Sequence, residues 1–389
     1  MRQLKFILPV IVLAQFFCTS LWFAGNGVMP GLIENFGLEA NDLGHLTSVV
    51  QFGFIVGTLL FALLSVADRF SPSHVFFTCA LLAGSFNLAV IWDENDFQSI
   101  IAIRFFTGFF LAGIYPVGMK IASDYFHEGL GKSLGFLVGA LVLGTAFPHL
   151  LSGISTTFEW QSVLITTSIL AFIGGLMILL FVPDGPFRKR SQQVEFSAMF
   201  KVFKAPAFRS AAFGYFGHMW ELYAFWAFVP IMITAFNKVH DHAFNVSLAS
   251  FAIIAIGGIA CVAGGFLSQR FGVKKVATLS LLISGVCCLL CPFVFLSGSA
   301  ILMIPFLLIW GMSVIADSPL FSTLVAQNAP AEWKGTALTI VNSLGFAITI
   351  MSIQLVSALL ANAESSFIFM ILAIGPLFGL IALRRHQHN

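Results

Sequence analysis

The chain has 389 residues, of which 58% are hydrophobic and 9% are charged, and its net charge at pH 7 is +2. Soluble domains carry about 25% charged residues, so this composition excludes a water-soluble protein and predicts an integral membrane protein in contact with a lipid bilayer. The net charge is too small to indicate a nucleic-acid partner.

Apolar segments of about 20 residues, the length that crosses a bilayer as a helix, recur along the whole chain. The twelve predicted spans cover residues 6–30, 45–66, 74–92, 98–124, 133–156, 161–182, 207–236, 244–268, 276–296, 300–326, 335–360 and 366–383. Strands of a β-barrel would be shorter and would alternate apolar with polar residues. The first apolar run is too long for a cleavable signal peptide and lacks a small-residue cleavage site, so we interpret it as a span. We expect an all-α membrane protein.

The positions of Lys and Arg predict the orientation of these spans, because cytoplasmic loops carry an excess of both residues. With both termini in the cytoplasm, all but three of the 19 Lys and Arg residues fall in cytoplasmic segments. The exceptions are Lys238 in an outside connection and Arg104 and Lys120 within spans. We therefore expect a multi-pass protein of the inner cell membrane with both termini in the cytoplasm.

The longest polar connection, residues 183–206, divides the chain into two halves of six spans, residues 1–182 and 207–389. Its mixture of apolar and basic residues is compatible with an amphipathic helix on the inner leaflet and also with a plain solvated linker. We expect a cytoplasmic linker between two six-helix bundles.

Two sequence landmarks recur in both halves at nearly the same separation. Arg270 follows Arg69 by 201 positions, and Lys334 follows Lys132 by 202 positions. Matched landmarks indicate an internal duplication and therefore two pseudo-symmetric bundles. Parallel repeats of this kind place the substrate site between the halves, near the midplane of the membrane.

These landmarks resemble the signatures of the major facilitator superfamily, and the resemblance extends over essentially the whole chain. It is carried by Gly57 with Asp68-Arg69-Phe70, by Gly265 with Gln269-Arg270-Phe271-Gly272, and by Arg104 with Gly108. The resemblance implies the twelve-helix major facilitator fold and alternating access, commonly driven by a proton gradient. It also implies conformational gating by Asp68, Arg69 and Arg270. Ser71-Pro72 replaces the glycine and basic residue typical of the first signature, which predicts weaker charge locking there.

Within the superfamily, the sequence is most similar in character to the cyanate- and nitrate-type and other small-anion permeases. The similar stretches are residues 21–26, 115–120 and 218–223. Nitrate itself is disfavoured as a substrate, because spans two and eight lack the arginines that nitrate transporters carry there. Span five lacks the Gly-Pro-x-x-Gly-Gly end of drug antiporters, which makes drug efflux a less favoured interpretation.

Two acidic residues, Glu221 and Asp317, lie deep within predicted spans seven and ten. Ionisable residues inside a membrane are rare and are functional by default, and a buried carboxyl can take up and release a proton near neutral pH. His218 lies three positions before Glu221, on nearly the same helix face. We predict that these three residues couple transport to proton movement. A fixed ion pair or a packing hydrogen bond is the structural alternative.

Arg104 in span four cannot plausibly deprotonate, so it needs a partner or an anionic ligand. As a substrate ligand it would bind a carboxylate or oxyanion in bidentate geometry. In the structural alternative it holds backbone carbonyls or a coupling acid. Polar and aromatic side chains complete the predicted substrate-binding set, among them a stripe with helical spacing in span one. They are Gln15, Trp22, Asn26, Tyr115, Trp220, Tyr223 and Asn342.

All six cysteines lie in apolar segments, and we interpret them as small buried hydrophobic residues rather than as disulfide or metal ligands. They are Cys18, Cys79, Cys261, Cys287, Cys288 and Cys291. No cofactor or resident metal is expected. A divalent-metal transporter is a weaker alternative, because only His218, Glu221 and Asp317 could serve as its ligands.

The leading hypothesis is a secondary transporter, acting as a monomer, that moves a small polar or anionic solute together with protons. A proton-driven efflux pump for organic compounds is the first alternative, favoured by the aromatic content. A membrane sensor is a further alternative, although a sensor would normally add a soluble domain. An enzyme is not expected, because the chain contains neither Gly-x-Ser-x-Gly nor His-Glu-x-x-His.

Overall fold

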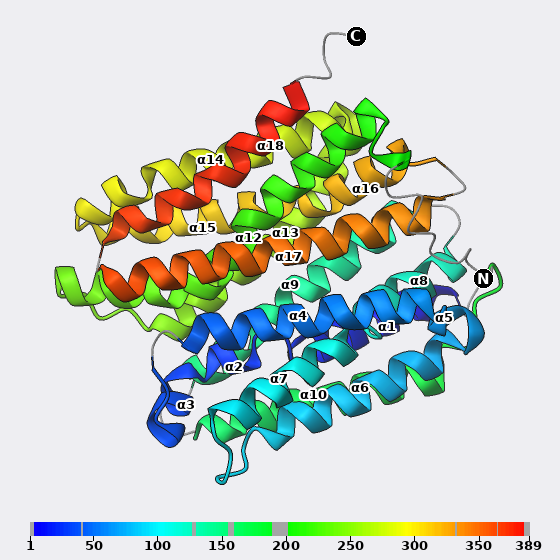
Figure 1. Ribbon diagram of the computed structural model, residues 1–389, viewed down its shortest axis with the longest axis horizontal. Coiled ribbons are helices and arrows are strands. Elements are labelled where there is room, and N and C mark those ends of the chain that lie inside the picture. Colours follow the sequence, from blue (N-terminus) through cyan, green and yellow to red (C-terminus); the bar gives the residue numbers. More distant parts are fainter. Residues whose placement is uncertain are drawn as a thin grey trace. The chain divides into compact units, whose positions relative to one another are not determined.

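The computed structural model describes residues 4–39, 42–126, 130–154, 159–188, 201–330, 333–363 and 365–384 (Figure 1). These residues form helices joined by short connections and contain no β-strand. The chain divides into two compact units, Met1–Gln193 and Val194–Asn389. Residues 189–200 of the predicted linker lie outside the described residues.

The first unit contains six helical segments packed against one another. Its helices are α1 (Leu4–Thr19), α2 (Ala24–Gly27), α3 (Met29–Phe36), α4 (Asp42–Leu63), α5 (Val66–Arg69), α6 (Pro72–Ala89), α7 (Phe97–Leu111), α8 (Tyr115–Tyr125), α9 (Leu130–Ile154) and α10 (Trp160–Phe181). The helices α1 to α3 form the first segment, and α7 with α8 forms the fourth. Within the unit, α4 packs against α7, while α1 and α6 both pack against α10.

The second unit also contains six segments. Its helices are α12 (Pro206–His240), α13 (Val246–Phe271), α14 (Val273–Leu296), α15 (Ala300–Ala316), α16 (Ser318–Asn328), α17 (Lys334–Asn362), the 3-10 helix η2 (Ser366–Ala373) and α18 (Ile374–Arg384). The long helix α12 packs against α16, α17 and α18, and α13 packs against α15. Helix α12 has 35 residues, and His218 and Glu221 are among its buried residues.

Ten helical segments of the described chain are long and apolar enough to cross a membrane. The first and third predicted spans are not among these ten: α1 ends at Thr19, and α6, although 18 residues long, includes the polar residues His74 and Asn87. Both nevertheless pack inside the first unit between the longer helices. The two sets of six segments together form the twelve-helix all-α fold that the sequence predicts.

Three of the predicted continuous spans are interrupted. The first breaks at residues 20–23, the fourth at residues 112–114 and the tenth at Asp317. Pro116 and Pro319 occupy the first turn of the helices that follow the last two breaks. Proline has no N–H and its ring clashes with the carbonyl four residues earlier, so each helix restarts instead of continuing. Hydropathy reports only length and polarity and therefore cannot show these breaks.

The same close helix crossing occurs once in each unit. A Cβ atom added to Gly108 would lie 2.0 Å from the carbonyl oxygen of Val50, and one added to Gly311 would lie 2.1 Å from that of Ile253. Both glycines and both carbonyls are separated by 203 positions along the chain. Small residues let helix backbones approach this closely, so the two units repeat one packing geometry.

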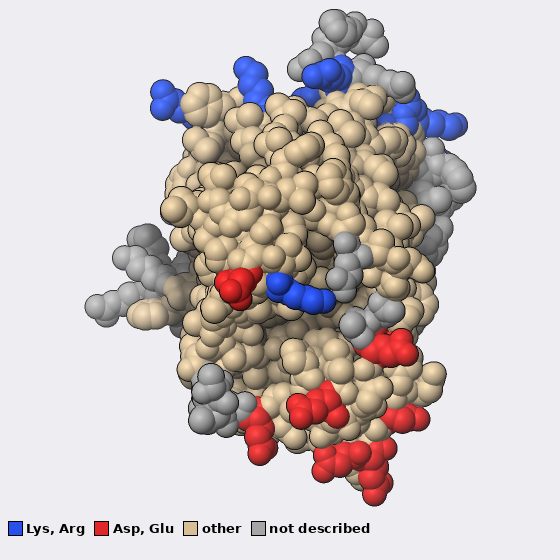
Figure 2. Space-filling view, turned by 90° about the vertical axis from the view of Figure 1, so that its left-hand side faces the viewer, with Lys and Arg blue, Asp and Glu red and all other residues tan. Residues whose placement is uncertain are grey.

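Acidic and basic residues concentrate at opposite ends of the helices. Figure 2 looks onto the helix ends at the left of Figure 1, and Asp and Glu side chains gather in the lower part of this face. In the first unit, the connections α3–α4, α6–α7 and α9–α10 and their flanking turns contain only acidic charges among the described residues. These acids are Glu34, Glu39, Asp42, Asp93, Glu94, Asp96 and Glu159.

Candidate functional site

Glu221 lies in the interior of the second unit, where three side chains donate hydrogen bonds to its carboxylate. Its Oε1 accepts from the indole Nε1 of Trp310 on α15 at 2.6 Å and from the thiol of Cys288 on α14 at 3.2 Å. Its Oε2 accepts from the hydroxyl of Ser284, also on α14, at 2.9 Å. Glu221 is 1% exposed. A buried carboxylate is expensive unless it is hydrogen-bonded, and these donors tie α12, α14 and α15 together at one point.

A second ionisable pair lies next to this cluster on the same helix. Nδ1 of His218 is 2.8 Å from Oδ1 of Asp317, and both side chains are buried. Asp317 occupies the junction of α15 and α16, where Pro319 interrupts the span. The Nε2 atom of His218 has no hydrogen-bond partner among the described residues. A buried polar atom of this kind normally has a hydrogen-bond partner, so Nε2 is a position where water or a polar ligand could bind.

The fold brings the three predicted proton-coupling residues into one region of the second unit. Glu221 and His218 are one helical turn apart on α12, and Asp317 reaches His218 from the α15–α16 junction. Among the described residues, no group of three or more His, Cys, Asp or Glu side chains has an arrangement that could hold a metal ion. The carboxylate of Glu221 instead accepts hydrogen bonds from three side chains.

Arg104 forms the buried polar centre of the first unit. Its guanidinium donates from Nη1 to Oδ1 of Asn87 at 3.0 Å, and from Nη2 to the carbonyls of Leu21 and Trp22 at 3.2 and 2.8 Å. Those carbonyls belong to the break between α1 and α2, where the regular helical hydrogen bonds are interrupted; the carbonyl of Leu21 also accepts a 3.4 Å turn hydrogen bond from the N–H of Ala24. The geometry matches the structural alternative for Arg104, in which it holds backbone carbonyls. No Asp or Glu of the described residues pairs with it.

Asn87 on α6 connects this arginine to α10. Its Nδ2 lies 3.0 Å from the hydroxyl of Ser168, and 3.2 Å from both the hydroxyl of Thr167 and the carbonyl of Leu164. Asn87 is fully buried. Arg104 on α7 and Asn87 on α6 therefore connect the break between α1 and α2 to α10.

The predicted substrate-binding residues of span one face two different helices: Trp22 and Asn26 meet α4, whereas Gln15 on α1 lies against Gly118 of α8. The Nδ2 atom of Asn26 donates to the hydroxyl of Thr47 at 2.8 Å, and the ring of Trp22 lies 4.8 Å from that of Phe54. Gln15 is fully buried, and neither atom of its amide has a hydrogen-bond partner in the described structure. Such an amide is expected to bind water or a polar ligand.

The remaining predicted substrate-binding residues are dispersed. Tyr115 is half-buried at the start of α8 in the first unit. In the second unit, Trp220 donates its indole N–H to the carbonyl of Ile371 and so faces η2. Tyr223 is buried against the rings of Trp226 and Phe346. Asn342 is half-buried on α17.

The sequence profile of the Major Facilitator Superfamily matches residues 11–353. The chain belongs to the major facilitator superfamily. Its solved structural neighbours agree in fold. The human organic anion transporter MFSD10 (TETRAN) superposes with a TM-score of 0.76 at 16% identity, covering 98% of this chain and 99% of that one. A bacterial homologue of the human lysosomal transporter Spinster, in an inward-facing and unoccupied conformation, gives 0.72 at 15% identity, covering 98% and 96%.

Curated relatives in the superfamily include aromatic-acid transporters. The 4-hydroxybenzoate transporter PcaK of Pseudomonas aeruginosa is 23% identical over 305 residues, which are 67% of this chain and 65% of the relative. PcaK of Acinetobacter baylyi is 23% identical over 195 residues, 47% of this chain and 40% of the relative. The matched regions therefore span less than two thirds of the length of these relatives.

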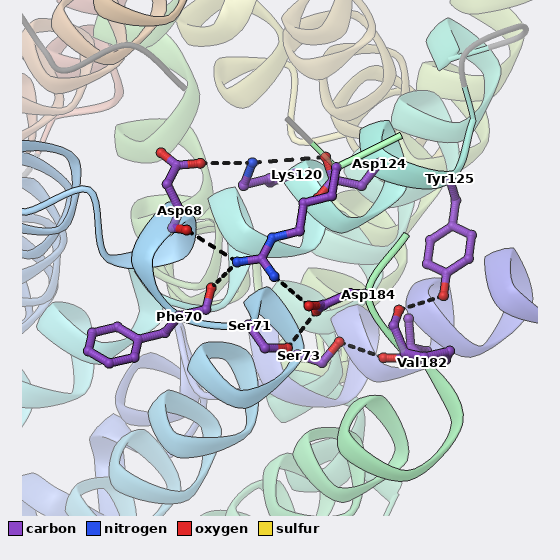
Figure 3. A network of polar contacts seen from close by, with 11 residues as sticks. Asp68, Phe70, Ser71, Ser73, Lys120, Asp124, Tyr125, Val182 and Asp184 are labelled. Atoms are coloured by element: carbon purple, nitrogen blue, oxygen red, sulfur yellow. Dashed lines mark hydrogen bonds and ion pairs between the residues drawn. The ribbon is translucent and has the colours of Figure 1, made fainter. Parts of the chain in front are cut away.

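The first superfamily signature, Asp68-Arg69-Phe70, takes part in a polar network at one end of the first unit (Figure 3). Asp68 lies 3.1 Å from Nζ of Lys120, which is also 3.9 Å from Asp124. Arg188 pairs with Asp184 and donates to the carbonyls of Asp68 and Phe70. Lys120 and Arg188 thus supply positive charges beside a signature in which Ser71-Pro72 replaces the usual glycine and basic residue.

The other two predicted gating residues lie outside this network. Arg69 is exposed beside Asp68, and Arg270 is exposed at the end of α13, over the ring of Phe271. The described contacts therefore bring only Asp68 of the three predicted gating residues into a paired arrangement.

Ser284, Cys288 and Asn87 were missed by sequence reasoning. A serine, a thiol and an amide inside apolar spans carry no local signal of function, and the cysteines were interpreted as hydrophobic residues. Cys288 instead bonds to Glu221. The one available signal was that buried Glu221 and Arg104 must have polar partners, which predicts that such partners exist without saying which helices provide them.

Proposed function

We propose that the chain is a secondary transporter that moves a small organic anion across the inner membrane by alternating access, coupled to protons. The observation that carries the proposal is the buried Glu221, held by three donors beside the His218–Asp317 pair. Two ionisable sites one turn apart on a helix of a transporter fold are suited to carry protons. Their partners come from α14, α15 and the α15–α16 junction, so a change of protonation would alter contacts among these helices.

Arg104 supports an anionic substrate. Its positive charge is buried and its hydrogen bonds go to neutral acceptors, while its Nε has no partner in the described residues. Such a charge makes the first unit electrostatically favourable for an anion. The relatives named for 4-hydroxybenzoate and the neighbour named for organic anions are consistent with an aromatic or other small carboxylate.

The same proposal includes the orientation and organisation of the chain. We place the basic ends of the helices in the cytoplasm, as the positive-inside rule predicts, with both termini on that side. Residues 1–182 and 207–389 would then be the two moving bundles, joined by the cytoplasmic linker 183–206, and a monomer would suffice for transport. Gating by Asp68 would act through its pairing with Lys120.

Uptake into proteoliposomes tests this proposal. The purified chain would be assayed with radiolabelled 4-hydroxybenzoate and a panel of small anions, with and without an imposed proton gradient. We expect gradient-driven accumulation that a protonophore abolishes and that Glu221→Gln eliminates. The matched control Glu159→Gln removes an exposed carboxylate at the start of α10 and should retain uptake. Accumulation that ignores the gradient and survives Glu221→Gln would refute proton coupling, and accumulation only under the opposite gradient would favour the efflux alternative.

A further inference from the structure

Ser284 differs from the other two partners of Glu221 in what it can do with a hydrogen bond. The indole N–H of Trp310 can only donate, and a thiol is a weak donor and weak acceptor. A serine hydroxyl can donate and accept with comparable strength. Ser284 also lies within hydrogen-bond distance of a second acceptor, the carbonyl of Leu281 at 3.1 Å.

When Glu221 is ionised, its carboxylate needs only donors. Trp310 and Cys288 then donate to Oε1, and Ser284 donates to Oε2 at 2.9 Å. Each carboxylate oxygen has at least one donor, and every side chain in the cluster is buried. Both oxygens of the ionised carboxylate therefore have hydrogen-bond donors from the protein and do not need water.

When Glu221 is protonated, one of its oxygens becomes a donor and must find an acceptor. A proton on Oε1 would point toward the N–H of Trp310, which lies 2.6 Å away and cannot accept. A proton on Oε2 would point toward Ser284, whose oxygen can accept it. The hydroxyl hydrogen of Ser284 can then turn to the carbonyl of Leu281. The protonated state is also satisfied, and no heavy atom needs to move.

We propose that Ser284 is the positioning residue that lets Glu221 gain and lose a proton in place, by reversing the direction of its hydrogen bond to Oε2. Trp310 acts with it by directing the proton away from Oε1. This inference rests on the proposed function, because it assumes that Glu221 carries a proton during transport.

Three other titratable groups interact electrostatically with Glu221: Cys287 and Cys288 on α14 and Asp317 at the α15–α16 junction. His218, one turn away on α12, pairs with Asp317. The charged residues of the remaining helices that pack around α12 lie in the first or last turns of those helices, away from its middle. They are Arg270, Lys274, Lys275, Lys334 and Arg384.

Infrared difference spectroscopy of the reconstituted full-length chain tests the proposal without knowledge of the substrate. Spectra recorded between acidic and alkaline pH should contain a carboxylic C=O band that Glu221→Gln removes. Ser284→Ala should shift this band to higher frequency, because the acid O–H loses its acceptor. Ser284→Thr keeps a hydroxyl and should leave the band in place. Ser352→Ala is the matched control, since Ser352 is a buried serine of the same unit that bonds the carbonyl three residues earlier but no carboxylate.

Transport of 4-hydroxybenzoate provides the second measurement. Ser284→Ala should slow gradient-driven uptake by about tenfold, because protonated Glu221 would be left as a buried donor without an acceptor. Ser284→Thr, which keeps the hydroxyl, should restore the rate. A Glu221 band that is identical in wild type and Ser284→Ala, with equal uptake, would overturn the role of Ser284 and leave the proposed function intact. The absence of any pH-dependent Glu221 band in the wild type would overturn the proposed function and this inference together.

Discussion

Gly108 and Gly311 lie at equivalent close helix crossings in the two units, so an alanine substitution at either position should lower stability by a similar amount. In Gly108→Ala the new Cβ would lie 2.0 Å from the Val50 carbonyl oxygen, and in Gly311→Ala it would lie 2.1 Å from that of Ile253. Real Cβ atoms essentially never approach within 3.0 Å, and both obstacles are backbone atoms. The helices must therefore separate by about 1 Å, and overpacking of this kind costs about 1–3 kcal/mol of unfolding free energy.

Thermal unfolding of the purified chain in detergent measures this effect. Gly108→Ala and Gly311→Ala should each lower the unfolding temperature, and by similar amounts, because the two crossings have the same geometry. Gly135→Ala on α9 and Gly265→Ala on α13 are the matched controls, since a Cβ at either position meets nothing within 4 Å. Alanine should stabilise those helices by about 0.5–1 kcal/mol. Equal behaviour of the crossing and control variants would refute the claim that these glycines set the helix separation.

Two further predictions concern buried and exposed charges of the first unit. Arg104→Lys should lower the unfolding free energy by about 2 kcal/mol or more. Lysine keeps the positive charge but lacks the planar guanidinium that reaches Asn87 and two backbone carbonyls. Each hydrogen bond from a charged donor contributes about 1.5–3 kcal/mol. The exposed Arg270→Lys should have no such effect, and equal thermal stability of the two variants would contradict the role of Arg104. At the start of α7, backbone and side-chain hydrogen bonds from Ser99 hold the pKa of Asp96 below its usual value. This stabilisation should be present above about pH 4, the ordinary pKa of Asp, and should be lost as pH falls through the lower folded-state pKa. The stability difference between wild type and Asp96→Ala should therefore vanish on acidification, and a difference that persists unchanged in acid would contradict the capping assignment.

The sequence by itself determined the class of the protein, its helical segments and the residues that needed an explanation. Long apolar runs have one stable solution in a bilayer, the helix, because backbone groups must be satisfied internally. Glu221, Asp317 and Arg104 were identifiable for the converse reason, since charges in such runs are costly unless they are partnered.

Only the tertiary structure shows which residues form hydrogen bonds with these buried charged groups and where the helices break. Glu221 depends on Ser284 and Cys288 from α14, more than 60 positions away, and no periodicity relates such distant residues. Arg104 holds carbonyls that become available only because α1 ends at Thr19. The proline breaks before α8 and α16 had a local cause in the sequence, yet hydropathy averages over them. Partner choice within a membrane bundle is a property of helix packing, and packing brings together residues that the sequence keeps apart.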